Sequence, residues 1–272
     1  MNSIRRALLA LFMMLVLFSV LVGAQPVMAQ EDAAVPAPEG AEEVLRAAEV
    51  ARSAGDAEAF AAYYADDAVY VALPPPPGTT GVFVGRAMLQ EISEELISRN
   101  FHVDFADFRV NGESATFTAL LSEDNFTDVG VAPIEFAGTA TVQDGMIVAE
   151  TLIMRPESLA RLIAAENKAL VQRLYNEVYT GRAPDTLGKL AAPDAIDAYR
   201  ASVAVTQATF PSLTATVDQL LVDGDQVVAI VTFAGTSAGG APITWSQVDI
   251  HRIADGLLAE TIRSGGPALS VE

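Results

Sequence analysis

Asp249 and His251 form the pair of side chains best suited to acid–base chemistry in this sequence. They stand two positions apart in a stretch that alternates polar and apolar residues, and Trp245 and Gln247 continue the polar set. Residues two apart in a strand point to the same side, so these four side chains would share one face. A carboxylate beside an imidazole can act as a general base, and an indole can stack on a flat ligand.

The direction of this polar face decides between two hypotheses. If it lines the domain interior, Asp249 is a candidate catalytic base, with His251 as its partner and Trp245 as a stacking wall. If it lies outside, Asp249 and His251 are solvated surface groups. Because the alternate residues Val248 and Ile250 are natural core residues, we expect the polar face to lie outside or at the rim.

The first half of the chain offers fewer reactive groups. His102 and Asp104 repeat the two-residue spacing, but aromatic and β-branched neighbours form the opposite face, so we expect this pair on the surface. The stretch 136–142 holds no ionisable side chain, and residues 151–155 supply no carboxylate at the end of the last strand. We therefore expect no catalysis in this half.

Four tyrosines are candidates for a ligand site. Tyr63, Tyr64, Tyr175 and Tyr179 fall in stretches with helical periodicity, and such helices should face a sheet. Tyrosines in this position are commonly core residues whose hydroxyl reaches a buried partner. With Trp245, they are the residues that we predict to contact a ligand.

Other kinds of site lack the residues that they need. The chain has no Cys and only 2 His, which excludes disulfides and thiol catalysis and argues against a zinc cluster. It also has no glycine-rich phosphate loop and no nucleophile elbow, so we predict neither a metal nor a cofactor. A formal charge of −19 repels phosphate backbones and anionic lipids, which argues against nucleic acid and membrane partners for the folded part.

Residues 1–29 have the layout of a secretory signal peptide. Two arginines precede the apolar run 7–22, and a small, turn-prone segment ends at Ala29. We expect cleavage after Ala29 and export from the cytoplasm. The alternative is an uncleaved N-terminal membrane anchor, for which the apolar run is short against the usual span of about 20 residues. Residues 30–40 are acidic and Pro-rich, which predicts a disordered linker.

The remainder of the chain is an internal duplication, because three landmarks recur in the same order. Each copy has two helical runs separated by a glycine, then a hairpin, then an Ala-Pro-Ile strand that leads through Asp-Gly to Ala-Glu-Thr. The Asn-Gly and Asp-Gly dipeptides between alternating apolar runs predict hairpins, because both turn positions need a positive φ. The matching positions are Gly55 and Gly181, 111–112 and 223–224, 132–134 and 241–243, and 149–151 and 259–261.

Each copy begins with helices and continues with strands. This order predicts an α+β fold: two tandem cone-shaped domains, each with N-terminal helices packed on a curved antiparallel sheet, whose mouth is a natural ligand pocket. We place domain 1 at 41–155, a bridging helix at 156–165 and domain 2 at 166–272. Helices are predicted at 42–53, 57–64, 86–98, 167–179, 184–191 and 198–209, and strands at 102–110, 114–122, 134–143, 147–154, 215–222, 226–234, 244–253 and 258–263.

Several motifs match a known family. Residues 170–179 read Leu-Val-Gln-Arg-Leu-Tyr-Asn-Glu-Val-Tyr, 190–194 read Leu-Ala-Ala-Pro-Asp, and 248–256 read Val-Asp-Ile-His-Arg-Ile-Ala-Asp-Gly. Copy two resembles the SnoaL-like polyketide cyclase and ester cyclase family over nearly all of 166–265. Copy one is similar to the broader SnoaL-like group of the nuclear-transport-factor-2-like superfamily through its motifs at 63–70 and 82–86.

The resemblance implies a fold more firmly than a function. The superfamily includes isomerases, cyclases, epoxide hydrolases and dehydratases besides non-catalytic binding modules. Its enzymes commonly use an acid or His inside the cone, often on the last strands, and neither copy ends its last strand on a carboxylate. We therefore expect a secreted binding protein for a small apolar ligand, whose two domains pair as an intramolecular pseudo-dimer. The alternatives are an isomerase or cyclase-type enzyme that uses Asp249 and His251, and a structural or protein-interaction module.

Overall fold

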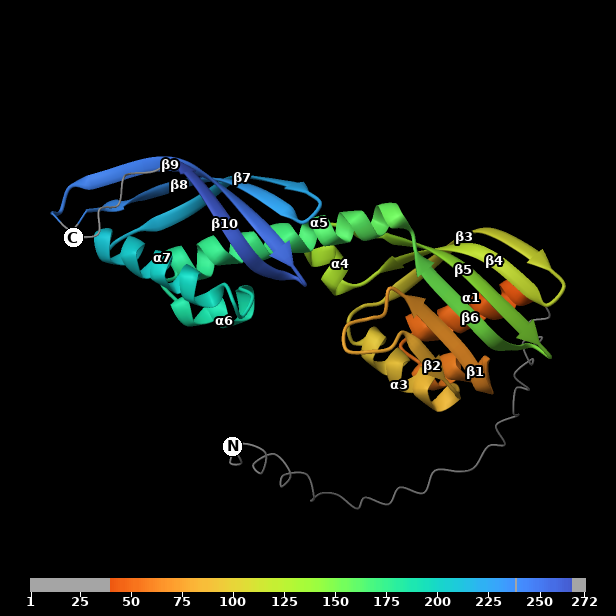
Figure 1. Cartoon of the computed structure of the whole chain (residues 1–272). Coiled ribbons are helices and arrows are strands. Elements are labelled where there is room, and N and C mark those ends of the chain that lie inside the picture. The colour runs from red at the N-terminus through yellow and green to blue at the C-terminus, as the bar shows by residue number, and fades with distance from the viewer. Residues whose placement is uncertain (1–39, 238, 266–272) are drawn as a thin grey trace, which may run out of the picture. The chain divides into compact units, whose positions relative to one another are not determined.

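The computed structural model describes residues 40–237 and 239–265, and it contains one sheet with its own helices for each copy (Figure 1). The predicted α+β fold with two tandem domains is confirmed. We call the elements from α1 to β6 domain 1 and those from α5 to β10 domain 2. The predicted signal peptide lies outside the described residues, as does nearly all of the predicted linker. No helix within the described ranges is both long and apolar enough to span a membrane.

Domain 1 packs its helices on a six-stranded sheet with the strand order β2-β1-β6-β5-β4-β3. The sheet is antiparallel except that β1 runs parallel to β6. Helix α1 contacts β3, β4, β5 and β6, so it covers one face. The elements are α1 Ala41–Ser53, α2 Ala57–Ala62, β1 Tyr64–Leu73, β2 Val82–Val84, α3 Arg86–Ile97, β3 His102–Asn111, β4 Ser114–Ser122, α4 Asp124–Asp128, β5 Ile134–Gln143 and β6 Met146–Met154.

The strands β1 and β2 were not predicted, and they correct the placement of two tyrosines. The helix expected to reach residue 64 ends at Ala62, and Tyr64 instead opens β1, where it pairs with Ile147. The residues that follow explain the strand, since Val69, Tyr70 and Val71 are of the β-branched and aromatic types that favour sheets. Tyr63 caps the end of α2 and is half-buried.

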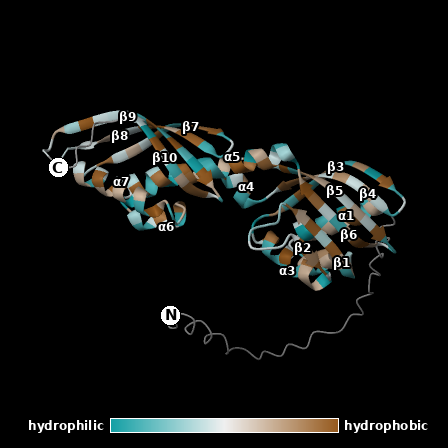
Figure 2. Ribbon diagram, in the orientation of Figure 1, coloured by the Kyte–Doolittle hydropathy of each residue, from teal (hydrophilic) through white to brown (hydrophobic). Residues whose placement is uncertain are grey.

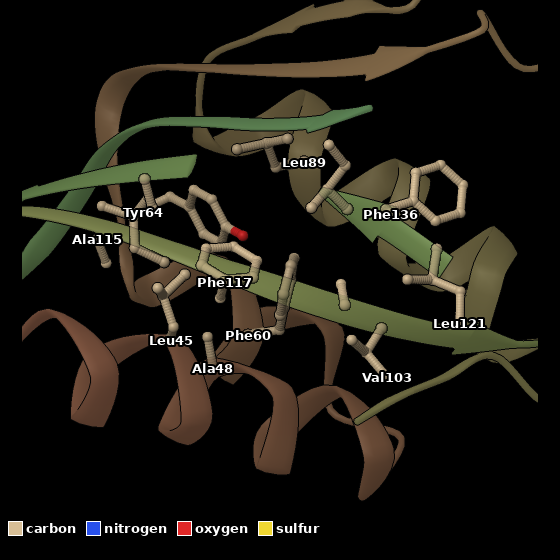
Figure 3. Close-up of a cluster of buried hydrophobic side chains, with 14 of the residues drawn as sticks. Leu45, Ala48, Phe60, Tyr64, Leu89, Val103, Ala115, Phe117, Leu121 and Phe136 are labelled. Carbon is tan, nitrogen blue, oxygen red and sulfur yellow. The ribbon is translucent and has the colours of Figure 1, made fainter. Parts of the chain in front are cut away.

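The core of domain 1 is rich in aromatic rings. Figure 3 shows Phe60, Tyr64 and Phe117 packed together with Leu45 between α1 and the sheet. Gly138 of β5 belongs to this packing, because a Cβ built there would lie 2.1 Å from Cε2 of Phe117. The absence of a side chain at this position therefore makes the room that the Phe117 ring occupies.

Domain 2 contains an antiparallel four-stranded sheet with the strand order β10-β9-β8-β7. The predicted bridge and the first helix of copy two form one continuous helix, α5, which begins at Pro156 in a first-turn position that suits proline. Polar and apolar residues alternate along the strands of both domains (Figure 2). The elements are α5 Pro156–Arg173, η1 Leu174–Thr180, η2 Pro184–Thr186, α6 Leu187–Leu190, α7 Ile196–Thr209, β7 Thr214–Asp223, β8 Gln226–Thr236, β9 Pro242–Ala254 and β10 Leu257–Gly265.

A π-helical turn, η1, replaces the end of the helix expected at 167–179. π-helical turns are rare in proteins, and those that occur often lie at functional sites. Gly181 closes it by donating its backbone N–H to the carbonyl of Asn176 at 2.8 Å, and a Cβ there would lie 2.7 Å from the carbonyl oxygen of Glu177. Within η1 the rings of Tyr175 and Tyr179 stack with centroids 5.6 Å apart, so both tyrosines turn to the same side.

Candidate functional site

The polar face of β9 lies inside domain 2, and the expectation that it faces outward is wrong. Asp249 and His251 are both 0% exposed, whereas Val248 on the other face is 37% exposed. A buried polar group costs free energy unless it is hydrogen-bonded. Side chains from η1, from β10 and from β9 itself supply those bonds, which is why polar residues can take the inner positions of this strand.

Asp249 is held by three donors. The hydroxyl of Tyr175 donates to Oδ2 at 2.6 Å, and Nε2 of Gln247 lies 3.0 Å from Oδ1 and 2.9 Å from Oδ2. Nε of Arg263 donates to Oδ1 at 3.2 Å and forms an ion pair with the carboxylate. Both carboxylate oxygens therefore already accept hydrogen bonds within the domain. For Asp249 to take a proton from a substrate, one of these donors would have to move away.

Arg263 is the most exposed member of this cluster, with 31% of its side chain accessible. It stands directly opposite Asp249 in the pairing of β10 with β9. One terminal nitrogen donates to the hydroxyl of Tyr179 at 2.9 Å, and the other donates to Oγ of Ser202 at 3.0 Å. A guanidinium has five N–H donors, so two remain beyond the three bonds made to described residues. Burial lowers the pKa of Arg263, but Tyr179 and Asp249 raise it more, so the side chain stays charged.

The hydrogen positions around His251 follow from counting donors. The single hydroxyl hydrogen of Tyr175 points to Asp249, so Nε2 of His251, 2.9 Å from that hydroxyl oxygen, must itself donate. Nδ1 of a neutral imidazole is then an acceptor, and Oγ1 of Thr261 lies 2.7 Å away to donate to it. The hydroxyl of Tyr199, 2.5 Å from Oγ1, completes the series. Hydrogen bonds thus run in one direction from Tyr199 to Asp249.

Burial keeps this network in its uncharged form apart from the ion pair. It lowers the pKa of His251 to about 4, although the nearby Asp249 acts in the opposite direction. It also raises the pKa of Tyr175 well above the ordinary value and that of Tyr199 to about 12. At neutral pH the imidazole is therefore neutral, and both phenols keep their protons.

An aromatic wall adjoins the polar cluster on the same face of β9. Trp245 is partly buried, and its indole N–H donates to Oε1 of Gln247 at 3.0 Å. Its ring stacks on Phe233 with centroids 5.0 Å apart and lies 4.9 Å from the ring of Phe210. The side chain of Gln247 therefore connects the indole to Asp249.

The structure brings together only some of the residues singled out from the sequence. Tyr175, Tyr179, Asp249 and His251 meet in domain 2, with Trp245 beside them. Tyr63 and Tyr64 lie in domain 1. His102 and Asp104 have side chains that are 53% and 72% exposed, which confirms their surface position.

Sequence reasoning missed four members of the domain 2 cluster as functional residues. Arg263 and Thr261 stand two apart on the last strand, and this spacing is the signal that places them on one face. Gln247 shares the alternation of β9 but was assigned no role. Tyr199 on α7 had no signal of its own, since nothing in its neighbourhood distinguishes it from a core tyrosine.

Glu150 is the acid that sequence reasoning missed in domain 1. It is only 4% exposed, and the hydroxyl of Tyr64 donates to its Oε2 at 2.6 Å. Burial raises its pKa to about 7, against the effect of the Tyr64 hydrogen bond. The signal was the alternation of Glu150 with the buried Leu152 and Met154. Glu150 lies just outside the two stretches, 136–142 and 151–155, in which the sequence was searched for an acid.

The two domains carry different residues at matching positions. In both, the pairing of the last two strands shifts by one residue directly after the pairs Val142–Ile147 and Ile253–Leu258. Counted from these pairs, domain 1 has Gly138, Ala140 and Glu150 where domain 2 has Asp249, His251 and Thr261. Asp249 therefore lies on the second-to-last strand of domain 2, whereas Glu150 lies on the last strand of domain 1. No group of three His, Asp or Glu in the described ranges is arranged to hold a metal ion.

Comparison with known families agrees with the duplicated fold. The family model described as "SnoaL-like domain" matches the chain twice, at residues 31–150 and 157–261. The chain belongs to the SnoaL-like family. No curated protein matches it.

Several solved structures resemble this SnoaL-like chain. One is an NTF2-like protein of unknown function from Cytophaga hutchinsonii, with 11% identity over 44% of this chain and 93% of that one and a TM-score of 0.35. Another, from Kribbella flavida, is provisionally described as a ketosteroid isomerase, with 21% identity over 41% and 75% and a TM-score of 0.32. A third, from Jannaschia, is provisionally described as a SnoaL-like polyketide cyclase, with 23% identity over 36% and 84% and a TM-score of 0.34.

Proposed function

We propose that this chain is an exported binding protein whose domain 2 takes a small apolar molecule carrying a carbonyl or carboxylate oxygen, without turning it over. The observation that carries the proposal is Arg263, a partly exposed cation beside the buried cluster, two of whose five N–H donors make no bond to the described residues. Export rests on the layout of residues 1–29, which is that of a signal peptide.

The apolar part of the ligand would rest on Trp245. This residue lies four positions before Asp249 on the same face of β9, roughly 13 Å at the usual rise per residue. Arg263 stands across from Asp249, so the indole and the guanidinium are about as far apart as the two ends of a two- or three-ring compound. Aromatic stacking at one end and hydrogen bonding at the other is a common pattern in small-molecule sites.

The contacts of Asp249 support binding over catalysis. A general base needs a lone pair within reach of the proton that it removes. Here Tyr175, Gln247 and Arg263 occupy both carboxylate oxygens. Arg263 also stands on the last strand, where enzymes of the superfamily commonly carry an acid.

An isomerase or cyclase-type enzyme is the second candidate, and one observation favours it. The directed series from Tyr199 to Asp249 could move a proton if each hydroxyl passed its hydrogen to the next group. In that case His251 and Asp249 would act through Tyr175 rather than as isolated groups.

A thermal-shift screen of the purified protein against apolar ketones, esters and carboxylic acids tests the binding proposal. A ligand present at about 100 times its dissociation constant adds roughly 2.7 kcal/mol of stability, which moves the midpoint on the order of 10 °C for one domain. We expect hits among oxygenated compounds and none among their hydrocarbon analogues. The Arg263→Gln variant should lose them. Equal responses to ketone and hydrocarbon, or hits that survive Arg263→Gln, would contradict the proposal.

A further inference from the structure

The groups around Arg263 include hydrogen-bond donors that no described residue uses. Tyr179 is 1% exposed, and its hydroxyl oxygen accepts a hydrogen bond from Nη2 of Arg263 at 2.9 Å. The hydroxyl also has one hydrogen to donate, and no described residue accepts it. Each terminal nitrogen of Arg263 keeps one further N–H that makes no bond to the described residues, beyond those given to Ser202 and Tyr179. A buried donor without an acceptor costs free energy, so this place favours a ligand that brings an oxygen.

These donors lie where the cluster reaches solvent. The side chain of Arg263 is 31% accessible, whereas Asp249 is completely buried. The hydroxyl of Tyr179 lies one hydrogen-bond length from the guanidinium. A ligand that approaches the cluster from solvent would therefore meet these donors before it meets the carboxylate.

The positive charge of Arg263 already has its counter-charge. Nε lies 3.2 Å from Oδ1 of Asp249, and no other Lys or Arg of the described residues bonds to this cluster. His251 is neutral near pH 7, because burial lowers its pKa to about 4. An anionic ligand would therefore place a second negative charge beside a single guanidinium.

We propose that Asp249 makes this site selective for uncharged oxygen acceptors, such as ketones and esters, and that Tyr179 donates its free hydrogen to them. The inference rests on the binding function proposed above and decides between the two ligand types named there. A carboxylate held by a terminal nitrogen of Arg263 would lie within about 8 Å of the Asp249 carboxylate, and charges at a partly buried site are screened little. It would also lose its hydration on entry, whereas a carbonyl brings neither cost.

An arginine without this partner would favour the opposite ligand. A guanidinium whose charge is not compensated binds carboxylates through two parallel hydrogen bonds. Here Asp249 occupies Nε, and the net charge of −19 adds to the repulsion of anions. Asp249 thus acts as a repulsive element against one class of ligand, a device that selective binding sites commonly use.

Three compounds with the same two-ring skeleton separate the charge of the ligand from its oxygen. 2-Acetylnaphthalene is a neutral ketone, 2-naphthoate is a carboxylate, and 2-ethylnaphthalene is a hydrocarbon. Calorimetry of the full chain at pH 7 should give the tightest binding for the ketone. The affinities for 2-naphthoate and 2-ethylnaphthalene should each be at least tenfold weaker.

Removing the charge of Asp249 should change this selectivity. In Asp249→Asn the affinity for 2-naphthoate should rise at least tenfold, because Arg263 then has no counter-charge, while that for the ketone stays within about threefold. Asp218→Asn is the matched control, since it removes the same charge from an exposed position on β7. Both affinities should be unchanged in that variant.

Titration of the ligand is a second measurement, and it needs no variant. A carboxylic acid with an ordinary pKa of about 4 gains on the order of a hundredfold in its uncharged fraction between pH 7 and pH 5. The affinity for 2-naphthoate should rise at least tenfold over this range, and that for the ketone should not change. The titratable groups that face the site are Tyr175, Tyr179, Tyr199 and His251. The imidazole is still mostly neutral at pH 5, because its pKa is about 4.

The hydroxyl of Tyr179 is tested by its removal. Tyr179→Phe keeps the ring that stacks on Tyr175, and it should weaken the binding of 2-acetylnaphthalene roughly fivefold without affecting 2-ethylnaphthalene. Tyr70→Phe, which removes a phenol from domain 1, should change neither affinity.

The outcomes separate this inference from the proposed function. Binding of 2-naphthoate at pH 7 as tight as that of the ketone would overturn the inference alone. So would a naphthoate affinity that neither Asp249→Asn nor pH 5 raises, or a ketone affinity that Tyr179→Phe leaves unchanged. A ketone that does not bind, or binds no better than 2-ethylnaphthalene, would contradict the proposed function, and the inference would fall with it.

Discussion

Arg263 and Asp249 face each other across β10 and β9, with Nε of the guanidinium 3.2 Å from Oδ1 of a carboxylate that is completely buried. The ion pair places a positive charge beside the Asp249 carboxylate and leaves part of the guanidinium accessible. Asp249 thereby holds Arg263 in place, and Arg263 presents the remaining donors. This division of roles is the basis of the binding proposal.

The ion pair should matter more for stability than surface pairs do. Arg263→Gln leaves the charge of Asp249 buried without a partner, and we expect a loss of about 2 kcal/mol in the free energy of unfolding, a value reduced for the partial exposure of the arginine. The double variant Asp249→Asn with Arg263→Gln should recover most of that loss, because no charge is then left alone. Urea unfolding at pH 7 measures both.

Arg252 provides the matched control on the neighbouring pair of residues. It forms an exposed ion pair with Glu260 at 3.5 Å in the same two strands. Arg252→Gln should cost less than about 0.5 kcal/mol. If the double variant Asp249→Asn with Arg263→Gln were less stable than Arg263→Gln alone, the loss in Arg263→Gln would not come from an unpaired charge on Asp249.

His251 should be neutral, with its hydrogen on Nε2, at every pH above about 5. Burial lowers its pKa to about 4, and the donor count fixes the tautomer. Nitrogen-15 NMR of the imidazole measures both properties. The chain has 2 histidines, and a His102→Asn variant separates the signals.

Thr261 is the residue that should hold this tautomer. Thr261→Val removes the hydroxyl that donates to Nδ1 and should give a mixture of tautomers, whereas Thr261→Ser should restore the single Nε2–H form. A histidine that carries its hydrogen on Nδ1 in the unaltered protein would contradict the hydrogen-bond direction from Tyr199 to Asp249.

Glu150 should make domain 1 less stable as the pH rises. Its pKa is raised to about 7 in the folded state from 4.5, so between these values the folded state binds the proton that the unfolded state has lost. Stability from this group is therefore full below pH 4.5 and lost as the pH rises to 7, by roughly 3 kcal/mol. The difference in unfolding free energy between Glu150→Gln and the unaltered protein should grow by that amount over this range.

The exposed Glu260 supplies the control for this pH dependence. Glu260→Gln should leave the pH profile of stability nearly as it is. His251 acts in the opposite direction in domain 2, because its pKa is lowered and its contribution to stability is lost as the pH falls from 6.5 toward 4. A Glu150→Gln profile parallel to that of the unaltered protein would mean that Glu150 is not buried as an acid.

Gly138 should resist substitution because of Phe117. A Cβ at this position would lie 2.1 Å from the ring, so Gly138→Ala should cost about 1–3 kcal/mol through overpacking. Gly188 of α6 has no atom within 4 Å of its Cβ position, so Gly188→Ala should be neutral or slightly stabilising. Unfolding free energies of the two variants check this contrast. Equal effects would show that the Phe117 ring does not depend on the missing side chain.

The order of elements was largely predictable because it depends on local patterns. Helical periodicity and the Asn-Gly and Asp-Gly turns gave most helices and hairpins in both copies. Strands β1 and β2 escaped because β1 follows helix α2 directly and a proline-rich loop, without the turn signals of a tight hairpin, separates it from the short β2. The π-helical turn at Leu174–Thr180 also escaped, since its residues fit an α-helix equally well.

The orientation of the candidate site was not predictable from one strand. The sequence of β9 alone favours Val248 and Ile250 as its inner residues. Tyr175 stands 74 positions earlier in the chain, and its hydrogen bond to Asp249 offsets part of the free-energy cost of burying the carboxylate. Only the packing of η1 against the sheet brings that hydroxyl to the carboxylate, so tertiary contacts reverse the local preference.

The central claim is that domain 2 binds through Arg263 and does not use Asp249 for chemistry. The direct test is calorimetry of the best oxygenated hit with the unaltered protein, Arg263→Gln and Asp249→Asn, with analysis of the compound after incubation. The account predicts an unchanged compound, affinity at least tenfold weaker in Arg263→Gln, and affinity nearly intact in Asp249→Asn, because the amide oxygen of Asn still accepts the hydrogen bond from Nε that holds Arg263 in place. Conversion of the compound by the unaltered protein that Asp249→Asn abolishes would contradict it and would establish the enzyme instead.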